Sequence, residues 1–174
     1  MTGDQSASPA HSSSLRGYRS YGRSGCWFVT KCLEPRRPLL VAGVAEKIAD
    51  AFVWYANQDK LPVAAFVVMP DHWHLMFHTV GGDDVVMFMR KACHWISRQT
   101  RVALQEGGAA WQDGFHETRI RTSRQFQFVR NYIENNPVRK EWTSSAAEWQ
   151  WSSAHPKYKH IVPLDWPVQF DKED

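Results

Sequence analysis

Two histidines separated by one residue stand in an otherwise apolar run of the chain. The run extends from Val67 to His78 and contains His72 and His74. In a β-strand, residues two apart point to the same face with Cα atoms about 6–7 Å apart, which lets both imidazoles reach one metal ion. A half-exposed strand also carries such a pair without a metal, and metalloproteins of unrelated activities use it. The pair therefore predicts a site without naming a reaction, and His78, farther along the same face, has no predicted role.

A tyrosine and an asparagine form a second candidate pair, sixty residues later. Tyr132 and Asn136 are four residues apart, so they share one edge of a predicted helix. A phenol has an ordinary pKa near 10 and becomes a nucleophile when its phenolate is stabilised. Alone, Tyr132 also fits an ordinary boundary aromatic, and Asn136 fits a helix stop before Pro137. The apolar stripe of this helix comprises Phe126, Val129 and Ile133.

Together the two pairs describe a metal-assisted attack on phosphate. A cation held by His72 and His74 polarises a phosphate oxygen and orients the leaving oxygen, while Tyr132 attacks. Mg²⁺ or Mn²⁺ is the expected metal, because hard cations serve most phosphate chemistry. The side-chain carbonyl of Asn136 is then the expected third protein ligand.

Strands and helices alternate in an order that positions these side chains. Period-two and β-branched runs predict strands at 24–31, 63–69 and 72–80, with a further strand near 118–121. Helical spacing predicts helices at 39–58, 83–105 and 122–136, the last opened by a capping box from Thr122 to Gln125. This order predicts an α+β, ferredoxin-like sandwich with an antiparallel sheet and helices on one face. The histidine face of the sheet is expected to stay open.

Positive charge is concentrated around the tyrosine helix. The whole chain carries a formal charge of only +3, but residues 119–140 contain six cations against one acid, an excess of five. Such a segment fits a polyanionic partner, and a solvated helix face is the alternative. The six cations are Arg119, Arg121, Arg124, Arg130, Arg139 and Lys140.

The remaining composition indicates one domain in a reducing compartment. Hydrophobic residues make up 43% of the 174 residues, enough for a core. Three cysteines without zinc spacing favour free thiols and a cytoplasmic location. No apolar run reaches the roughly 18 residues that span a membrane, and the first residues lack the features of a secretory signal. We expect a disordered leader at 1–15, a catalytic domain at 16–160 and a C-terminal tail at 161–174.

Several short sequence blocks follow one another along the chain. They are Met69-Pro70-Asp71-His72-Trp73-His74, Trp111-Gln112, Phe115-His116-Glu117, Ile120-Arg121, Tyr132-Ile133-x-x-Asn136-Pro137-Val138 and Trp151-Ser152-Ser153. Together, in this order, they resemble REP-associated tyrosine transposases, a branch of the HUH single-strand endonucleases. The resemblance covers most of the chain, from about residue 18 to residue 158. One departure is the absence of a glycine soon after the Asn-Pro-Val block.

The resemblance implies a ferredoxin-like fold, metal ligation by His72, His74 and Asn136, and a nucleophilic Tyr132. The tyrosine would attack a DNA phosphate to give a 5′-phosphotyrosine link and a free 3′-hydroxyl. Family substrates are single-stranded DNA with hairpins from repetitive extragenic palindromes (REP), cut beside a guide tetranucleotide. Relatives include monomers and also homodimers that share the tyrosine helix, and the sequence leaves both open.

DNA contacts are expected from the six cations and from an N-terminal arm formed by Tyr18, Arg19 and Arg23. Two other functions fit parts of the sequence. A non-catalytic protein of the same fold would bind structured DNA without cutting it. A metal hydrolase acting on a small molecule would use the histidine pair, but it would leave the basic tyrosine helix without a role.

Overall fold

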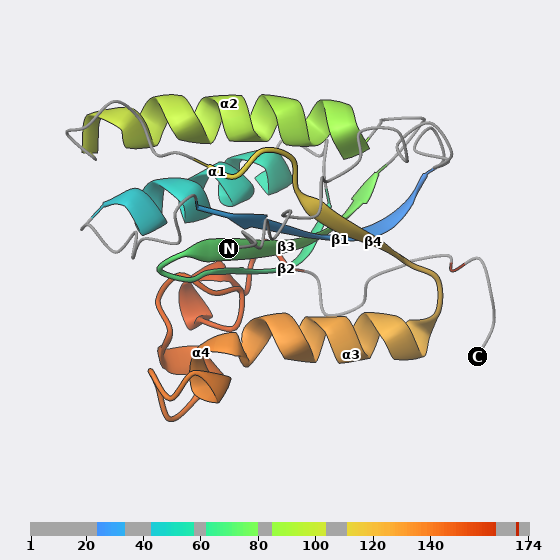
Figure 1. Ribbon diagram of the computed structural model, residues 1–174. Helices are drawn as coiled ribbons and strands as arrows, with labels where there is room; N and C mark the ends of the chain where they lie inside the picture. The colour runs from blue at the N-terminus through green and yellow to red at the C-terminus, as the bar shows by residue number, and fades with distance from the viewer. Residues whose placement is uncertain are drawn as a thin grey trace, which may run out of the picture.

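A four-stranded antiparallel sheet forms the centre of the molecule (Figure 1). The computed structural model describes residues 24–33, 43–57, 62–79, 85–103, 111–162 and 170. The strands are β1 (Gly25–Cys32), β2 (Val63–Val68), β3 (His72–Thr79) and β4 (His116–Ile120). Their order across the sheet is β2-β3-β1-β4, with every neighbouring pair antiparallel. This is the ferredoxin-like arrangement that the element order predicts.

Helices cover both faces of the sheet, which corrects the prediction that they cover one. Helices α1 (Val44–Asn57) and α2 (Val85–Ala103) lie on one side, and α3 (Ser123–Glu134) lies on the other (Figure 1). Helix α3 packs against β2 and β3. Connectivity determines the side of α1 and α2, because each connects two strands of the sheet. Helix α3 follows the last strand, so its side depends on which face still has apolar surface to bury.

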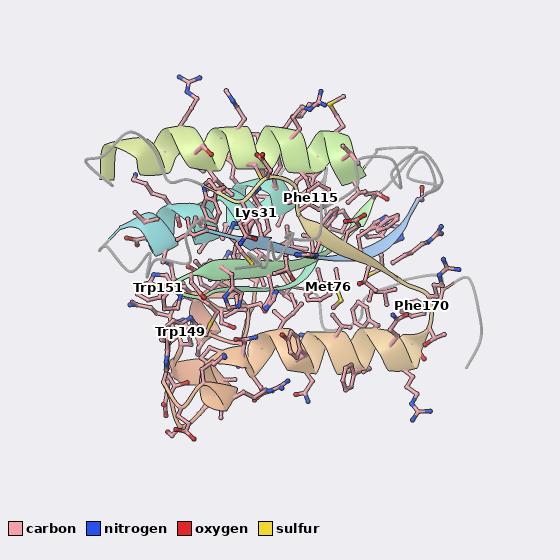
Figure 2. All side chains as sticks on the ribbon, in the orientation of Figure 1. Lys31, Met76, Phe115, Trp149, Trp151 and Phe170 are labelled. Carbon is pink, nitrogen blue, oxygen red and sulfur yellow. The ribbon has the colours of Figure 1, made fainter. Side chains whose placement is uncertain are left out.

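Alternate residues of β3 supply both apolar layers. Trp73, Leu75 and Phe77 are buried with residues of α1 and α2, as the sequence predicts. Met76 is buried with residues of α3, and Figure 2 shows it between the sheet and that helix. Lys31 lies on the opposite side, toward α2 (Figure 2). The histidine face is therefore a second core layer, not an open surface.

The predicted capping box determines where α3 begins. Thr122 is the N-cap, and its Oγ1 accepts a hydrogen bond of 3.1 Å from the backbone N–H of Gln125. The Gln125 side chain accepts 2.9 Å from the N–H of Arg121, one residue earlier than in the usual box. Helix α3 ends at Glu134, and a short helix α4 (Asn136–Arg139) follows. Pro137 suits the first turn of α4, where no backbone N–H is needed.

The segment after α4 closes the edge of the sheet at β2. It includes the 3₁₀ helices Ala146–Glu148 and Pro156–Tyr158. The backbone N–H of Val68 donates 2.9 Å to the carbonyl of Trp151, and the indole N–H of Trp149 donates 3.0 Å to the Val68 carbonyl. Both tryptophans lie at this end of the sheet (Figure 2). Within the described residues, no helix has the length and apolarity needed to cross a membrane.

Candidate active site

The two histidines of the His-x-His pair are adjacent, and each is oriented through its Nδ1 atom. The ring centroids of His72 and His74 lie 4.7 Å apart. His72 Nδ1 lies 2.6 Å from a carboxylate oxygen of Asp71, and His74 Nδ1 lies 2.8 Å from Thr30 Oγ1 on the paired strand β1. A histidine that ligates a metal through Nε2 keeps its proton on Nδ1 and donates it to a partner of this kind. Both rings are thus held in the orientation that leaves Nε2 for a ligand.

His74 is buried and neutral. Its exposed fraction is 4%, and its Nε2 makes no hydrogen bond to any part of the chain that the structure describes. Burial is the main cause that lowers the pKa of His74 to about 3, and the nearby His72 adds to it, while Asp71 opposes the shift. A neutral imidazole with an unpaired buried nitrogen costs free energy in an apolar core. It is also the form of histidine that binds metals.

Tyr132 from α3 lies directly against this pair. The Tyr132 and His74 ring centroids are 5.4 Å apart, and Phe28 from β1 contacts both rings, at 6.1 Å and 5.3 Å. The guanidinium carbon of Arg139 lies 5.0 Å from the centre of the Tyr132 ring. The two halves of the site predicted from separate parts of the sequence therefore meet within one chain.

Asn136 lies at the first residue of α4 and is 5% exposed. Its Oδ1 is buried and, within the described part of the chain, makes no hydrogen bond. A buried amide oxygen without a donor is unusual and suits a cation, for which carbonyl oxygen is a ligand. The described residues contain no group of three or more His, Cys, Asp and Glu that could hold a metal ion. A third protein ligand would thus be of another type, as Asn136 is.

The six predicted DNA-binding cations do not form a single surface. Arg119 contacts Trp27, on the face covered by α1 and α2, with 5.9 Å between its guanidinium carbon and the ring. Arg130 pairs with Glu134 at 3.4 Å, and Arg139 lies over Tyr132. Three others are exposed at the two ends of the α3–α4 unit: Arg121, Arg124 and Lys140. Tyr18, Arg19 and Arg23 of the predicted arm, and the predicted leader, lie outside the described residues.

Two site residues, Thr30 and Phe28, were not predicted from the sequence. Both lie on β1 and face α3, and Thr30 pairs with His74 in the sheet register. The alternation of β1 puts them on one face, but only the register brings Thr30 opposite His74 and Phe28 opposite the neighbouring Met76. His78 lies on the same strand as the histidine pair, and burial, followed by the charge of Arg119, lowers its pKa.

The family comparison matches the region that contains this site. Residues 28–136, more than half of the chain, match the family model described as "Transposase IS200 like". The chain belongs to the IS200-like transposase family. The matched residues begin at Phe28 and end at Asn136, so they include the histidine pair and Tyr132.

Individual transposases resemble the chain over most of its length. The REP-associated tyrosine transposase of Escherichia coli K12 is 27% identical over 154 residues, covering 85% of this chain and 88% of the relative. A solved structure of a REP-associated tyrosine transposase bound to a REP hairpin is 27% identical, covers 87% of this chain and 90% of its own, and has a TM-score of 0.64. A structure from Deinococcus radiodurans, 22% identical with a TM-score of 0.50, supports the fold alone.

Proposed function

We propose that the chain nicks and rejoins single-stranded DNA through Tyr132, with the help of a divalent cation. The observation that carries the proposal is the contact of Tyr132 with His74, 5.4 Å between ring centroids. The Nε2 atom of His74 is buried and has no partner in the described chain. A phenol next to a histidine of this kind suits metal-assisted nucleophilic attack on phosphate.

In the nicking step, the Tyr132 phenol oxygen forms a bond to a DNA phosphorus and loses its proton. The bond between that phosphorus and the 3′-oxygen breaks, and the 3′-oxygen leaves as a hydroxyl after it takes up a proton. The DNA is then joined to the protein through a 5′-phosphotyrosine. Attack of a 3′-hydroxyl on this phosphorus reverses the step and releases Tyr132, so rejoining needs no other energy source.

His72, His74 and Asn136 are the residues that would hold the cation. Their fit rests on the two oriented imidazoles and on the buried, unpaired Asn136 Oδ1. Mg²⁺ or Mn²⁺ bound there would polarise a non-bridging phosphate oxygen. Asp71 and Thr30 keep the two imidazoles in place, and Phe28 excludes water from one side of Tyr132.

The proposed substrate is a DNA hairpin of the REP type with a single-stranded flank. Support comes from the solved relative that is bound to a REP hairpin. Arg121 also supports a DNA partner, because it is exposed and lies just before α3, whose first turn has no acid. A cation at that end opposes the helix dipole, and a phosphate there would be favourable for both.

The test is formation of a covalent protein–DNA adduct. Labelled palindromic hairpins from the host's own repeats are incubated with the full chain and Mn²⁺, then analysed under denaturing conditions. We expect an adduct in the wild type and none in Tyr132→Phe or in EDTA. Tyr55→Phe is the matched control, because Tyr55 lies on α1, on the opposite side of the sheet, and this variant should behave like the wild type.

An adduct that persists in Tyr132→Phe would show that another residue is the nucleophile. Hairpin binding without cleavage, at every divalent cation tried, would favour the alternative of a non-catalytic DNA-binding protein. Both outcomes are read from the same reactions when binding is measured in parallel by a gel-shift assay.

A further inference from the structure

A cavity of about 600 Å³ lies beside the C-terminal half of α3, between that helix and residues 144–162. Arg130 and Glu134 line it. They are four residues apart and therefore share one side of the helix, whereas Tyr132 is two residues from each and points elsewhere. Asn135 also lines the cavity, and the next residue, Asn136, is the candidate metal ligand. The cavity is thus separate from the tyrosine site but adjacent to it.

One wall of the cavity is a carboxylate held in a fixed orientation. The hydroxyl of Ser153 donates a hydrogen bond of 3.2 Å to Glu134 Oε1. It also accepts a hydrogen bond of 3.1 Å from the backbone N–H of Phe66 on β2. Arg130 Nε donates 3.4 Å to the same Oε1. Glu134 and Arg130 are about one-fifth exposed. Against the described residues, Glu134 Oε2 and the terminal guanidinium nitrogens make no further hydrogen bond, so this wall presents an acceptor beside donors.

The rest of the lining supplies apolar surface and one more positive charge. Val138, Ala154 and Val162 are small or branched apolar side chains that suit a flat ring. Lys159, also in the lining, is exposed and can meet a phosphate. Pockets of a few hundred Å³ hold single small molecules, and a nucleotide is of that size. The charge arrangement therefore fits one nucleotide of a nucleic-acid strand.

We propose that this cavity binds one unpaired guanine of the DNA strand whose phosphate Tyr132 attacks, an inference that rests on the proposed function. Guanine presents two neighbouring N–H donors, at N1 and N2, and an acceptor at O6. Glu134 accepts from the two donors, and Arg130 donates to O6. Adenine and cytosine would place a ring-nitrogen acceptor against the carboxylate, which is itself an acceptor, so they fit poorly. Thymine has no amino group and offers the carboxylate only one donor. Glu134 thereby becomes a specificity residue, and Arg130 contacts a base instead of serving only as a phosphate contact.

The test measures binding in the Tyr132→Phe background, so that no chemistry intervenes. The probe is a DNA hairpin with all-thymine single-stranded flanks that carry one guanine, moved position by position. We expect one position at which guanine tightens binding about tenfold over inosine, which lacks the N2 amino group, in line with the ~1–3 kcal/mol of a well-formed base contact. Glu134→Gln, added to this background, should reduce the ratio of guanine to inosine affinity to about one.

The matched control is Glu148→Gln. Glu148 lies in the same C-terminal segment, but its carboxylate accepts hydrogen bonds from Ser144, so the guanine preference should survive its replacement. Absence of any guanine-sensitive position overturns the proposal, as does a preference that survives Glu134→Gln. Adduct formation by the wild-type chain is scored separately. An adduct without guanine preference would contradict only the guanine site. Guanine preference without an adduct would contradict only the nuclease activity. Failure to bind any hairpin would contradict both.

Discussion

The two faces of the sheet are both covered by helices, yet they are built from different residues. Under α1 and α2, β3 contributes Trp73, Leu75 and Phe77, all buried with other apolar side chains. Under α3, the same strand contributes Met76 together with His72 and His74. With alternate residues, one strand thus supplies a wholly apolar layer and a layer that mixes histidines with apolar Met76.

From this difference we infer that one face serves mainly stability and the other serves the proposed chemistry. The α1–α2 face gains free energy from burying large apolar side chains. The α3 face contains a buried histidine nitrogen and a buried asparagine oxygen without partners in the described chain, an arrangement that costs free energy. The α1–α2 face also buries such atoms, on Trp73 and Tyr158. The faces therefore differ in the type of atom, because imidazole nitrogen and amide oxygen are metal ligands.

The sharpest test replaces neighbouring residues of β3 that face opposite ways. Trp73→Ala should lower the free energy of unfolding by about 3–5 kcal/mol through the cavity it leaves. His74→Ala should abolish the DNA adduct completely yet cost less stability, because the removed ring is smaller and its unpaired Nε2 is itself costly to bury, although the contact of Nδ1 with Thr30 is lost. Urea unfolding and the adduct assay measure the two effects. If both replacements lowered the free energy of unfolding equally, the two faces would not differ in their contribution to stability.

Acid should weaken the metal-free protein through the histidine face. The pKa of His74 is lowered to about 3 in the fold, whereas an exposed histidine has a pKa of about 6.5. Between these values the unfolded chain binds a proton that the folded chain does not, so stability should fall as pH drops from about 6.5 toward 3. Urea unfolding in EDTA at successive pH values measures this, and His74→Ala should give a shallower slope. Identical slopes would contradict the assignment.

The orientation of the histidine pair should matter less than the histidines themselves. Thr30→Val keeps the shape of the side chain but removes the partner of His74 Nδ1. Losses of about 10–100-fold in metal affinity or activity are usual for such partners. We expect the Mn²⁺ concentration for half-maximal adduct formation to rise in this range, and Thr30→Ser to restore it. A Thr30→Val variant with wild-type Mn²⁺ dependence would leave the hydrogen bond without a functional role.

The smallest expected effect separates two neighbouring cations after α3. Arg139 lies over the Tyr132 ring, and a cation–π contact of this kind contributes about 0.5–1 kcal/mol. Arg139→Gln should slow adduct formation at saturating DNA by about two- to fivefold. Lys140→Gln removes the same charge one residue later and should change only the DNA concentration that gives half-maximal adduct formation. If both variants alter only that concentration, Arg139 is a simple phosphate contact.

The sequence was sufficient for the four strands and the three long helices, though not for α4, and for the division of β3 into two faces. Strong periodicity located the strands and helices, and Thr122 with Gln125 correctly predicted the start of α3. The side on which α3 packs was predicted wrongly, because the connection order does not determine it. The histidine face is a core layer because apolar residues of several strands gather there, among them Cys26 of β1, Val67 of β2 and Met76 of β3. No single strand's pattern reveals this.

The histidine pair and the tyrosine helix could each be predicted from the sequence, but the contacts between them could not. His72, His74 and Tyr132 stand out by type and spacing, and the structure brings them together. Thr30 and Arg139 acquire their roles from the sheet register and from the turn into α4, which are tertiary properties. Arg130 and Glu134 were not paired from the sequence, although their four-residue spacing allows it, and the cavity beside them depends on the path of the C-terminal segment.

The C-terminal segment that lines the cavity also affects how a second copy of the chain could approach the sheet. Sheet edges are surfaces on which a further strand readily adds. At β2 the backbone of Val68 and the N–H of Phe66 are bonded to Trp151 and Ser153 of the same chain. A second copy that joined the sheet there would first have to displace these bonds. Ser153, which donates to the Glu134 carboxylate, therefore also helps to protect the β2 edge against strand exchange and aggregation.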